Sequence, residues 1–178
     1  GCILAHSIRH ADGVFKKGRK RALDDLKLLS ASGVSKIFVA QLDADDVPED
    51  EAARAIAGKI AGSGAAAQEP FTGRANVYAQ QRGLVVVDGF RVNAINRVHE
   101  SMTLATLPNY HVVDKGQMIA TIKIIPFAVA RGDIDKALAE IGAMPVIRVQ
   151  VLAEKRVGLV ITKVAGGNMR MSTRTRYR

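Results

Sequence analysis

The segment at residues 72–76 (TGRAN) concentrates side chains that could hold an anion. Arg74 carries a planar guanidinium that can bind a phosphate through two parallel hydrogen bonds, and the Asn76 amide can both donate and accept. Thr72 adds a hydroxyl group and Gly73 a permissive backbone. These residues are therefore a candidate binding site. A bulge or turn in which acidic residues neutralise Arg74 explains the same pattern at least equally well.

A second candidate follows residues 157–161, a continuously apolar run of the kind found in strands buried within a parallel sheet. Thr162, Gly166 and Gly167 come directly after this run. At that position an open α/β sheet binds ligands, and backbone N–H groups can hold a phosphate. The alternative is an ordinary turn between a strand and a helix, because one glycine pair is a weak signal.

Lys123 lies inside an apolar stretch, residues 122–125. A lysine that points inward needs an anionic partner, since a buried unpaired charge is costly. The alternation of side chains along a strand favours the outward direction, in which Lys123 is an ordinary exposed residue. Both interpretations are kept, and Lys123 is the third candidate for anion binding.

The sequence gives less support to a metal site or to a catalytic site. Cys2, His6 and His10 are spaced by four residues, which would align them as metal ligands on a helix, but the surrounding residues are typical of a strand. We therefore expect no metal site. His99 and His111 have no neighbours that would complete a catalytic triad, and no Ser or Cys lies in a recognisable nucleophile motif.

The elements that must position these residues are four helices and several short strands. Apolar residues at helical spacing predict the helices, and Asp, Pro and Gly residues mark their ends. The predicted helices cover residues 21–32, 46–61, 88–98 and 133–141, and the predicted strands cover residues 3–8, 14–15, 34–42, 71–79, 83–87, 102–107, 112–113, 118–127, 146–152 and 157–161. Residues 65–70 are predicted to be a loop. This order predicts an α+β fold.

Local signals add detail to this prediction. Asp46 and Glu49 have the spacing of a capping box at the start of the second helix, with Pro48 in its first turn. Asp88 is the predicted cap of the third helix. Two hairpins are predicted, one pairing residues 3–8 with residues 14–15 and the other pairing residues 112–113 with residues 118–127.

The composition predicts a soluble, folded, cytoplasmic protein. Hydrophobic residues make up 48% of the 178 residues, and no stretch approaches the roughly 20 apolar residues that a membrane span needs. The N-terminus lacks the pattern of a secretory signal. A single cysteine excludes an internal disulfide.

The net charge of +9 is unevenly distributed. Residues 1–40 carry +5, residues 41–70 carry −5 and residues 168–178 carry +4. The acidic block has a structural explanation, because the start of a helix favours negative charge. A basic module that binds nucleic acid through residues 16–21 and the arginine-rich tail is the alternative function. The aromatic content of 4% argues against it, since few side chains can stack on bases.

Seven motifs occur along the chain in the order GCILAHSIR, FKKGR, SGVSKIFVAQLD, DVPEDEAARAIA, FTGRANVYA, SMTLATLP and MIATIKIIPFAV. In this order they resemble the N-terminal region of a family of molybdopterin-binding proteins of molybdenum-cofactor biosynthesis. The general layout is also similar to that of the molybdopterin molybdotransferases. The resemblance covers roughly residues 1–167 and ends at Asn168, where the chain becomes arginine-rich.

The resemblance implies a domain organisation. Residues 1–153 would form the N-terminal α+β region, with a division into two small subdomains near residues 65–70. The segment RVGLVITKVAGG is similar to the first strand and glycine-rich loop of a molybdopterin-binding α/β domain, so residues 154–167 would begin such a domain without completing it. Beyond the resemblance, the arginine-rich composition of residues 168–178 and their lack of apolar periodicity predict a disordered basic tail.

The resemblance also implies a function. The chain would be a scaffold or binding module for molybdopterin or its nucleotide form, and would not be a complete enzyme. Catalysis would belong to the parent protein, as a nucleotidyltransferase of the cofactor or a molybdotransferase-like enzyme. The partner is then a small anionic pterin, and a homo-oligomer is compatible with this function. The candidate contacts to the pterin are Arg74, Asn76, Lys123, Thr162, Gly166 and Gly167.

Overall fold

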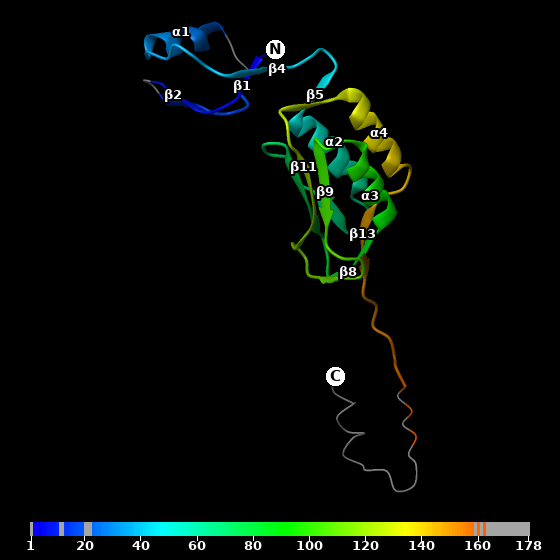
Figure 1. Ribbon diagram of the computed structural model, residues 1–178. Helices are drawn as coiled ribbons and strands as arrows, with labels where there is room; N and C mark the ends of the chain where they lie inside the picture. Colours follow the sequence, from blue (N-terminus) through cyan, green and yellow to red (C-terminus); the bar gives the residue numbers. More distant parts are fainter. Residues whose placement is uncertain (1, 11–12, 20–22, 159, 161, 163–178) are drawn as a thin grey trace.

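The computed structural model describes residues 2–10, 13–19, 23–158, 160 and 162. These residues form a mixed α+β fold, which confirms the predicted class. Figure 1 shows an N-terminal arm, residues 2–45, that extends to one side of a larger body, residues 46–151. Residues 152–158 lead away from the body.

Each of the four predicted helices is present. Helix α1 spans Leu23–Ala31, α2 spans Glu49–Ile60, α3 spans Gly89–Val98 and α4 spans Arg131–Ile141. The Asp88 carboxylate caps α3 as predicted, because it accepts a hydrogen bond from the Arg91 N–H. Gly142 follows α4 with a φ of 68°, a conformation that glycine adopts without strain.

The predicted capping box at the start of α2 is wrong. Residues Asp46–Pro48 form a short strand, β5, that pairs with β12 (Ala128–Ala130). This pairing keeps the chain extended as far as Pro48, which occupies the cap position, so the helix begins only at Glu49. The Asp46 carboxylate accepts a hydrogen bond from the Asp43 N–H instead.

The largest sheet of the body is antiparallel, with the strand order β6-β7-β11-β9. Its strands span Ala65–Ala67 (β6), Arg74–Ala79 (β7), Met118–Ile124 (β11) and Met102–Thr106 (β9). Residues 65–67 are not the predicted loop, because their backbone pairs with β7. A subdomain division near residues 65–70 would therefore separate two strands that pair directly.

A second sheet places β8 (Gly83–Val87) between β10 (Val112–Val113) and β13 (Ile147–Val151). The predicted hairpin between residues 112–113 and 118–127 is therefore wrong. Both edges of β11 are occupied, one by β7 and the other by β9, so β11 has no edge left for β10. Strand β10 pairs with β8 instead.

Helix α2 covers one face of the four-stranded sheet, with α3 and α4 on the same side (Figure 1). The α2 side chains that face the sheet are fully buried, and three of the five are alanines: Ala52, Ala53, Ile56, Ala57 and Ile60. They share one core with alternate residues of β7 and β11, such as Val77 and Ile122. Small side chains let the helix approach the sheet closely.

The Asn96 side chain of α3 lies against the outer edge of β9. Its Nδ2 donates to the Leu104 carbonyl oxygen at 2.9 Å, and its Oδ1 accepts from the Leu104 N–H at 2.7 Å. The inner edge of β9 pairs with β11. The amide of Asn96 therefore takes the place of a neighbouring strand for one residue of β9.

The arm contains two small sheets. Strand β1 (Cys2–Leu4) pairs with β4 (Val39–Gln41), and β2 (Ile8–His10) pairs with β3 (Gly13–Phe15). The predicted hairpin is thus correct for β2 and β3 only. Residues 2–4 pair instead with β4, which follows α1 in the chain.

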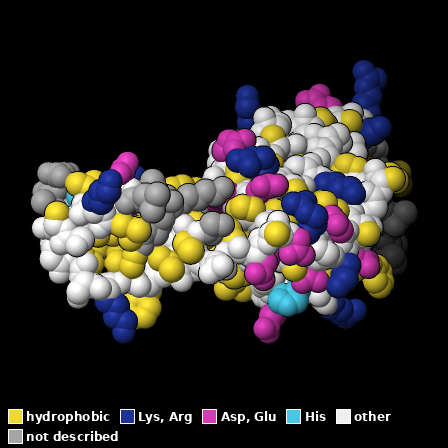
Figure 2. Space-filling model, turned by 90° about the horizontal axis from the view of Figure 1, so that it is seen from above, with side chains coloured by type: hydrophobic (Ala, Val, Ile, Leu, Met, Phe, Trp, Pro, Cys, Tyr) yellow, Lys and Arg dark blue, Asp and Glu magenta, His cyan; other side chains and the backbone are white. Residues whose placement is uncertain are grey.

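The arm has a small core and several exposed apolar side chains. Leu4, Phe15 and Leu29 form a cluster of their own, separate from the core of the body. Figure 2 shows the arm as a narrower part beside the body, with hydrophobic side chains on its surface. The arm contacts the body where the Lys17 ammonium lies 4.8 Å from the centroid of the Phe127 ring.

The predicted buried strand at residues 157–161 is wrong for those of its residues that the structure describes. Val157 and Val160 are 87% and 88% exposed and belong to no strand. A strand requires a neighbour with which to pair, and no described residue pairs with this segment. The glycine-rich loop and the basic tail predicted to follow lie outside the described residues.

Gly83 is required where β8 meets β13. A Cβ atom there would lie 2.3 Å from the Gln150 carbonyl oxygen and 2.8 Å from Cγ1 of Val149. Because backbone must move to relieve this clash, we expect Gly83→Ala to lower the free energy of unfolding by about 1–3 kcal/mol. Urea denaturation measures this change.

Gly58 is the matched control for Gly83. It is exposed within α2, and a Cβ atom there would meet nothing within 4 Å. We expect Gly58→Ala to raise the free energy of unfolding by about 0.5–1 kcal/mol, because alanine loses less backbone entropy in a helix. Equal effects of the two substitutions would contradict the close approach of β8 and β13.

Candidate functional site

Three of the predicted site residues lie together on the face of the four-stranded sheet that is turned away from α2. We call this surface the open face. In β7, Ala75, Val77 and Ala79 are buried in the core, so the alternating residues between them point the other way. The same alternation applies to β9 and β11. The open face contains Arg74, Asn76, Tyr78, Thr103, Ala105, Thr121 and Lys123.

The strand register arranges these side chains in two rows. Lys123 lies opposite Arg74 on one side and Thr103 on the other, which forms a cationic row across three strands. Thr121 lies opposite Asn76 and Ala105 in the same way. We call this second set the amide row. The two rows are separated by two residues along each strand, a distance of about 7 Å.

Hydrogen bonds order the amide row. The Thr121 hydroxyl donates to Oδ1 of Asn76 at 2.8 Å, which fixes the orientation of the amide. The amide nitrogen of Asn76 in turn donates to the Tyr78 hydroxyl oxygen in a longer contact of 3.4 Å. The proton of the Tyr78 hydroxyl is left to donate to a ligand.

A tight turn before β7 fixes the cationic row in place. Thr72 and Gly73 both have positive φ angles, 50° and 72°, and the Lys123 ammonium donates to the Thr72 carbonyl oxygen at 2.6 Å. The Gly73 N–H donates to the Asp50 carboxylate of α2, also at 2.6 Å. A Cβ atom at Gly73 would lie 2.6 Å from the Ile124 carbonyl oxygen, so the turn depends on glycine.

The cationic row places two like charges directly opposite each other. Arg74 and Lys123 are cross-strand partners, with Cα atoms roughly 5 Å apart, and such a pair of like charges destabilises a sheet. The four strands contain no Asp or Glu. The side chain of Arg74 forms no hydrogen bond or ion pair with any described residue, so the acidic residues near it do not neutralise it. A bound anion would offset this repulsion.

Glu49, at the start of α2, is the acidic residue that Lys123 influences. Burial raises the pKa of Glu49 above its ordinary value of 4.5; the Lys123 ammonium opposes this change, the Asp50 carboxylate adds to it, and the Lys17 ammonium of the arm opposes it. Burial dominates, so the charged form of Glu49 is disfavoured in the folded protein. The Glu49 carboxylate therefore only partly balances the positive charge of Lys123.

An apolar groove of about 180 Å³ lies at the other end of β9 and β11. Its lining consists of Ala105, Thr106, Leu107, Met118, Ile119, Ala120 and Thr121. Thr121 and Ala105 belong both to the groove and to the amide row. The groove, the amide row and the cationic row thus follow one another along the strands, an order that suits a ligand with a flat ring at one end and an anion at the other.

The structure does not place the other residues that were predicted to contact the pterin at this site. Thr162 is exposed in the segment that leads away from the body, and Gly166 and Gly167 lie outside the described residues. Sequence reasoning missed Tyr78 and Thr121. Both lie at even spacing from a residue that was identified, Asn76 or Lys123, so strand alternation is the signal that would have found them.

Two further features considered in the sequence analysis are a metal site and the basic cluster. No group of three or more His, Cys, Asp and Glu side chains in the described part of the chain could hold a metal ion. In the basic cluster at residues 16–21, Arg19 forms a two-pronged ion pair with Asp25, and Lys17 contacts Phe127. Residues 20–21 lie outside the described part. Nucleic-acid binding through this cluster stays a prediction.

No family model, no curated protein and no solved structure matches this chain. Within the described ranges, no helix combines the length and the apolar character that crossing a membrane requires. The residues of the open face and their geometry are therefore the basis for a functional proposal.

The raised pKa of Glu49 predicts a dependence of stability on pH. A carboxyl group whose pKa is higher in the folded state than in the unfolded state disfavours folding once it ionises. The free energy of unfolding should therefore decrease as the pH rises from 4.5 through the raised pKa of Glu49. We expect Glu49→Gln to remove this decrease, measured by urea denaturation across that pH range.

Glu51→Gln is the matched control, because Glu51 lies in the same helical turn but is exposed. It should keep the pH dependence of the wild-type protein. If Glu51→Gln abolished the decrease and Glu49→Gln kept it, the burial of Glu49 would not be its cause.

Proposed function

We propose that this chain is a binding module for a small anionic pterin, molybdopterin or its nucleotide form, and that it acts in molybdenum-cofactor biosynthesis. The observation that carries the proposal is the cross-strand pair of cations Arg74 and Lys123, which forms no ion pair with a described residue and lies next to the amide row and the apolar groove. The resemblance of the sequence motifs to molybdopterin-binding proteins supports the same ligand. The proposal includes a cytoplasmic location and is compatible with a homo-oligomer.

The ligand would lie along β11, with its ring over the groove and its phosphate on the cationic row. Arg74 and Lys123 bind the phosphate through charge-assisted hydrogen bonds, which are stronger than those between neutral groups. The edge of a pterin ring presents donors and acceptors that match the Asn76 amide and the Tyr78 and Thr121 hydroxyls. The separation of about 7 Å between the rows sets the distance between ring and phosphate.

The side chains of the open face bind and orient a ligand. They include no Ser–His or Cys–His pair and no pair of carboxylates, the combinations used for nucleophilic and acid–base catalysis. The proposed role is therefore to hold the pterin and hand it on. Any nucleotidyl transfer or molybdenum insertion in the parent protein would use other residues.

Arg74→Gln tests the cationic row. We expect it to weaken the binding of a fluorescent pterin monophosphate by about 10–100-fold, because a hydrogen bond to a charged group is worth about 1.5–3 kcal/mol. Fluorescence titration measures the dissociation constant. The same pterin without phosphate should bind both proteins equally, since its ring would contact only the groove and the amide row. Arg97→Gln, an exposed charge on α3, is the control.

Glu49→Gln should act in the opposite direction. Removal of the negative charge leaves Lys123 without a competing anion. The pterin monophosphate should therefore bind up to about five-fold more tightly, because an interaction between exposed charges contributes at most about 1 kcal/mol. If Arg74→Gln and Arg97→Gln bound the phosphorylated pterin with equal affinity, the cationic row would not be the phosphate site.

A further inference from the structure

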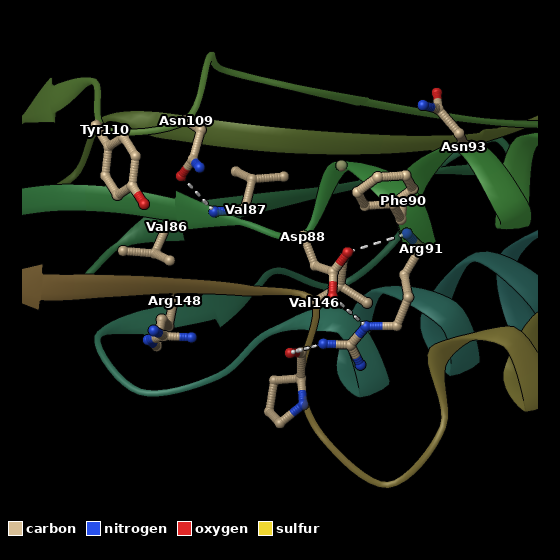
Figure 3. A pocket seen from close by; sticks show the side chains of 12 residues that line it. Val86, Val87, Asp88, Phe90, Arg91, Asn93, Asn109, Tyr110, Val146 and Arg148 are labelled. Atoms are coloured by element: carbon tan, nitrogen blue, oxygen red, sulfur yellow. Dashed lines mark hydrogen bonds and ion pairs between the residues drawn. The ribbon is translucent and has the colours of Figure 1, made fainter.

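A second hollow, of about 550 Å³, lies beside the N-terminus of α3 and is shown in Figure 3. It shares no lining residue with the groove or with the open face. Its volume is within the range of pockets that hold small ligands. The lining comes from four segments that are distant in the sequence: β8 with the start of α3, residues 109–110, the loop after α4, and β13.

The base of this hollow is held rigidly by Asp88 and Arg91. The Asp88 carboxylate accepts from the Arg91 backbone N–H at 3.2 Å and from Nε of Arg91 at 2.9 Å. These hydrogen bonds from Arg91 keep the pKa of Asp88 below its ordinary value. The guanidinium also donates to three carbonyl oxygens, that of Ile141 at the end of α4 and those of Met144 and Pro145 in the loop that follows. Both charged groups are thus occupied within the protein, and the hollow is preformed.

Other polar groups at the hollow are available to a ligand. Oδ1 of Asn109 accepts from the Val87 N–H at 3.0 Å, which orients the amide and leaves its NH₂ group to donate elsewhere. Arg148 is exposed on β13 and forms no hydrogen bond or ion pair with any described residue. The hollow therefore offers one unpaired cation and one oriented amide.

Two exposed aromatic rings border the same hollow. Phe90 is 92% exposed and Tyr110 is 65% exposed. In Figure 3, Tyr110 and Arg148 lie on one side of the hollow, and Phe90 and Arg91 lie on the other. Tyr110 also has a φ of 64°, a strained conformation for a residue other than glycine. Aromatic rings beside a positive charge are the combination with which proteins hold a base and its phosphate.

We propose that this hollow binds a nucleoside monophosphate. Its base stacks on Phe90, across the hollow from Arg148, the Asn109 amide donates to the edge of the base, and the Arg148 guanidinium binds the phosphate. Aromatic side chains with amide donors are the usual means by which proteins hold an unpaired base. A single arginine suits one phosphate group. The site is independent of the open face and goes beyond the proposed pterin function.

Calorimetric titration of the full chain with AMP, GMP, CMP and UMP, each separately, tests the proposal. We expect at least one of them to bind with a sub-millimolar dissociation constant. Phe90→Ala should weaken that binding by about 5–100-fold, the range measured for the stacking of one base. Arg148→Gln should weaken it by at least about ten-fold, but should not change the binding of the corresponding nucleoside, which lacks the phosphate.

Arg97→Gln, on the exposed side of α3, is the control for the loss of a positive charge and should keep the affinity of the wild-type protein. All the substituted side chains are exposed, and circular dichroism verifies that each variant is folded. The proposal is overturned if none of the four nucleotides binds, or if either Phe90→Ala or Arg148→Gln binds as tightly as the wild-type protein. Loss of nucleotide binding in Arg74→Gln would place the nucleotide on the open face and would also overturn it.

Discussion

The packing of α2 against β7 and β11 determines both the core and the open face. Because the helix presents three alanines to the sheet, it lies close to the strands. It covers one face of the sheet, so every second residue of β7 and β11 is buried against it. Arg74, Asn76 and Lys123 must then point to the other side. The N-terminus of the same helix also binds the turn before β7, since the Asp50 carboxylate accepts from the Gly73 N–H. One helix thus buries the apolar residues and orients the polar ones.

The sequence predicts the helices well, because the apolar spacing and the Asp88 cap are local signals that tertiary structure reinforces. It predicts strand pairing poorly. Alternation shows which face of a strand is buried but not which strand lies beside it, so β10 is predicted to pair with β11 and instead pairs with β8. The capping box fails for a related reason: Asp46 has the right spacing, but pairing with β12 holds its backbone in a strand. Val157 and Val160 are apolar, yet both are exposed, because no described strand pairs with them.

The sequence shows which residue types the site contains. It does not show that these residues lie next to one another. Arg74 and Lys123 are chemically suited to anions, but only the register of β7 and β11 makes them cross-strand partners. That register depends on long-range contacts with no local signature. The hollow beside α3 was missed because four segments form it and only Asp88 carries a recognisable signal. Exposed aromatic residues such as Phe90 are identified as unusual only when their burial is known.

The contact between Asn96 and Leu104 has a consequence for how the protein behaves in solution. A strand at the edge of a sheet exposes N–H and C=O groups that can pair with another polypeptide, which is a common route to aggregation. On β9, the Asn96 amide satisfies both backbone groups of Leu104 at the middle of the strand. An incoming strand would have to displace this side chain before it could extend the sheet. Helix α3 therefore protects the β9 edge of the largest sheet from unwanted self-association.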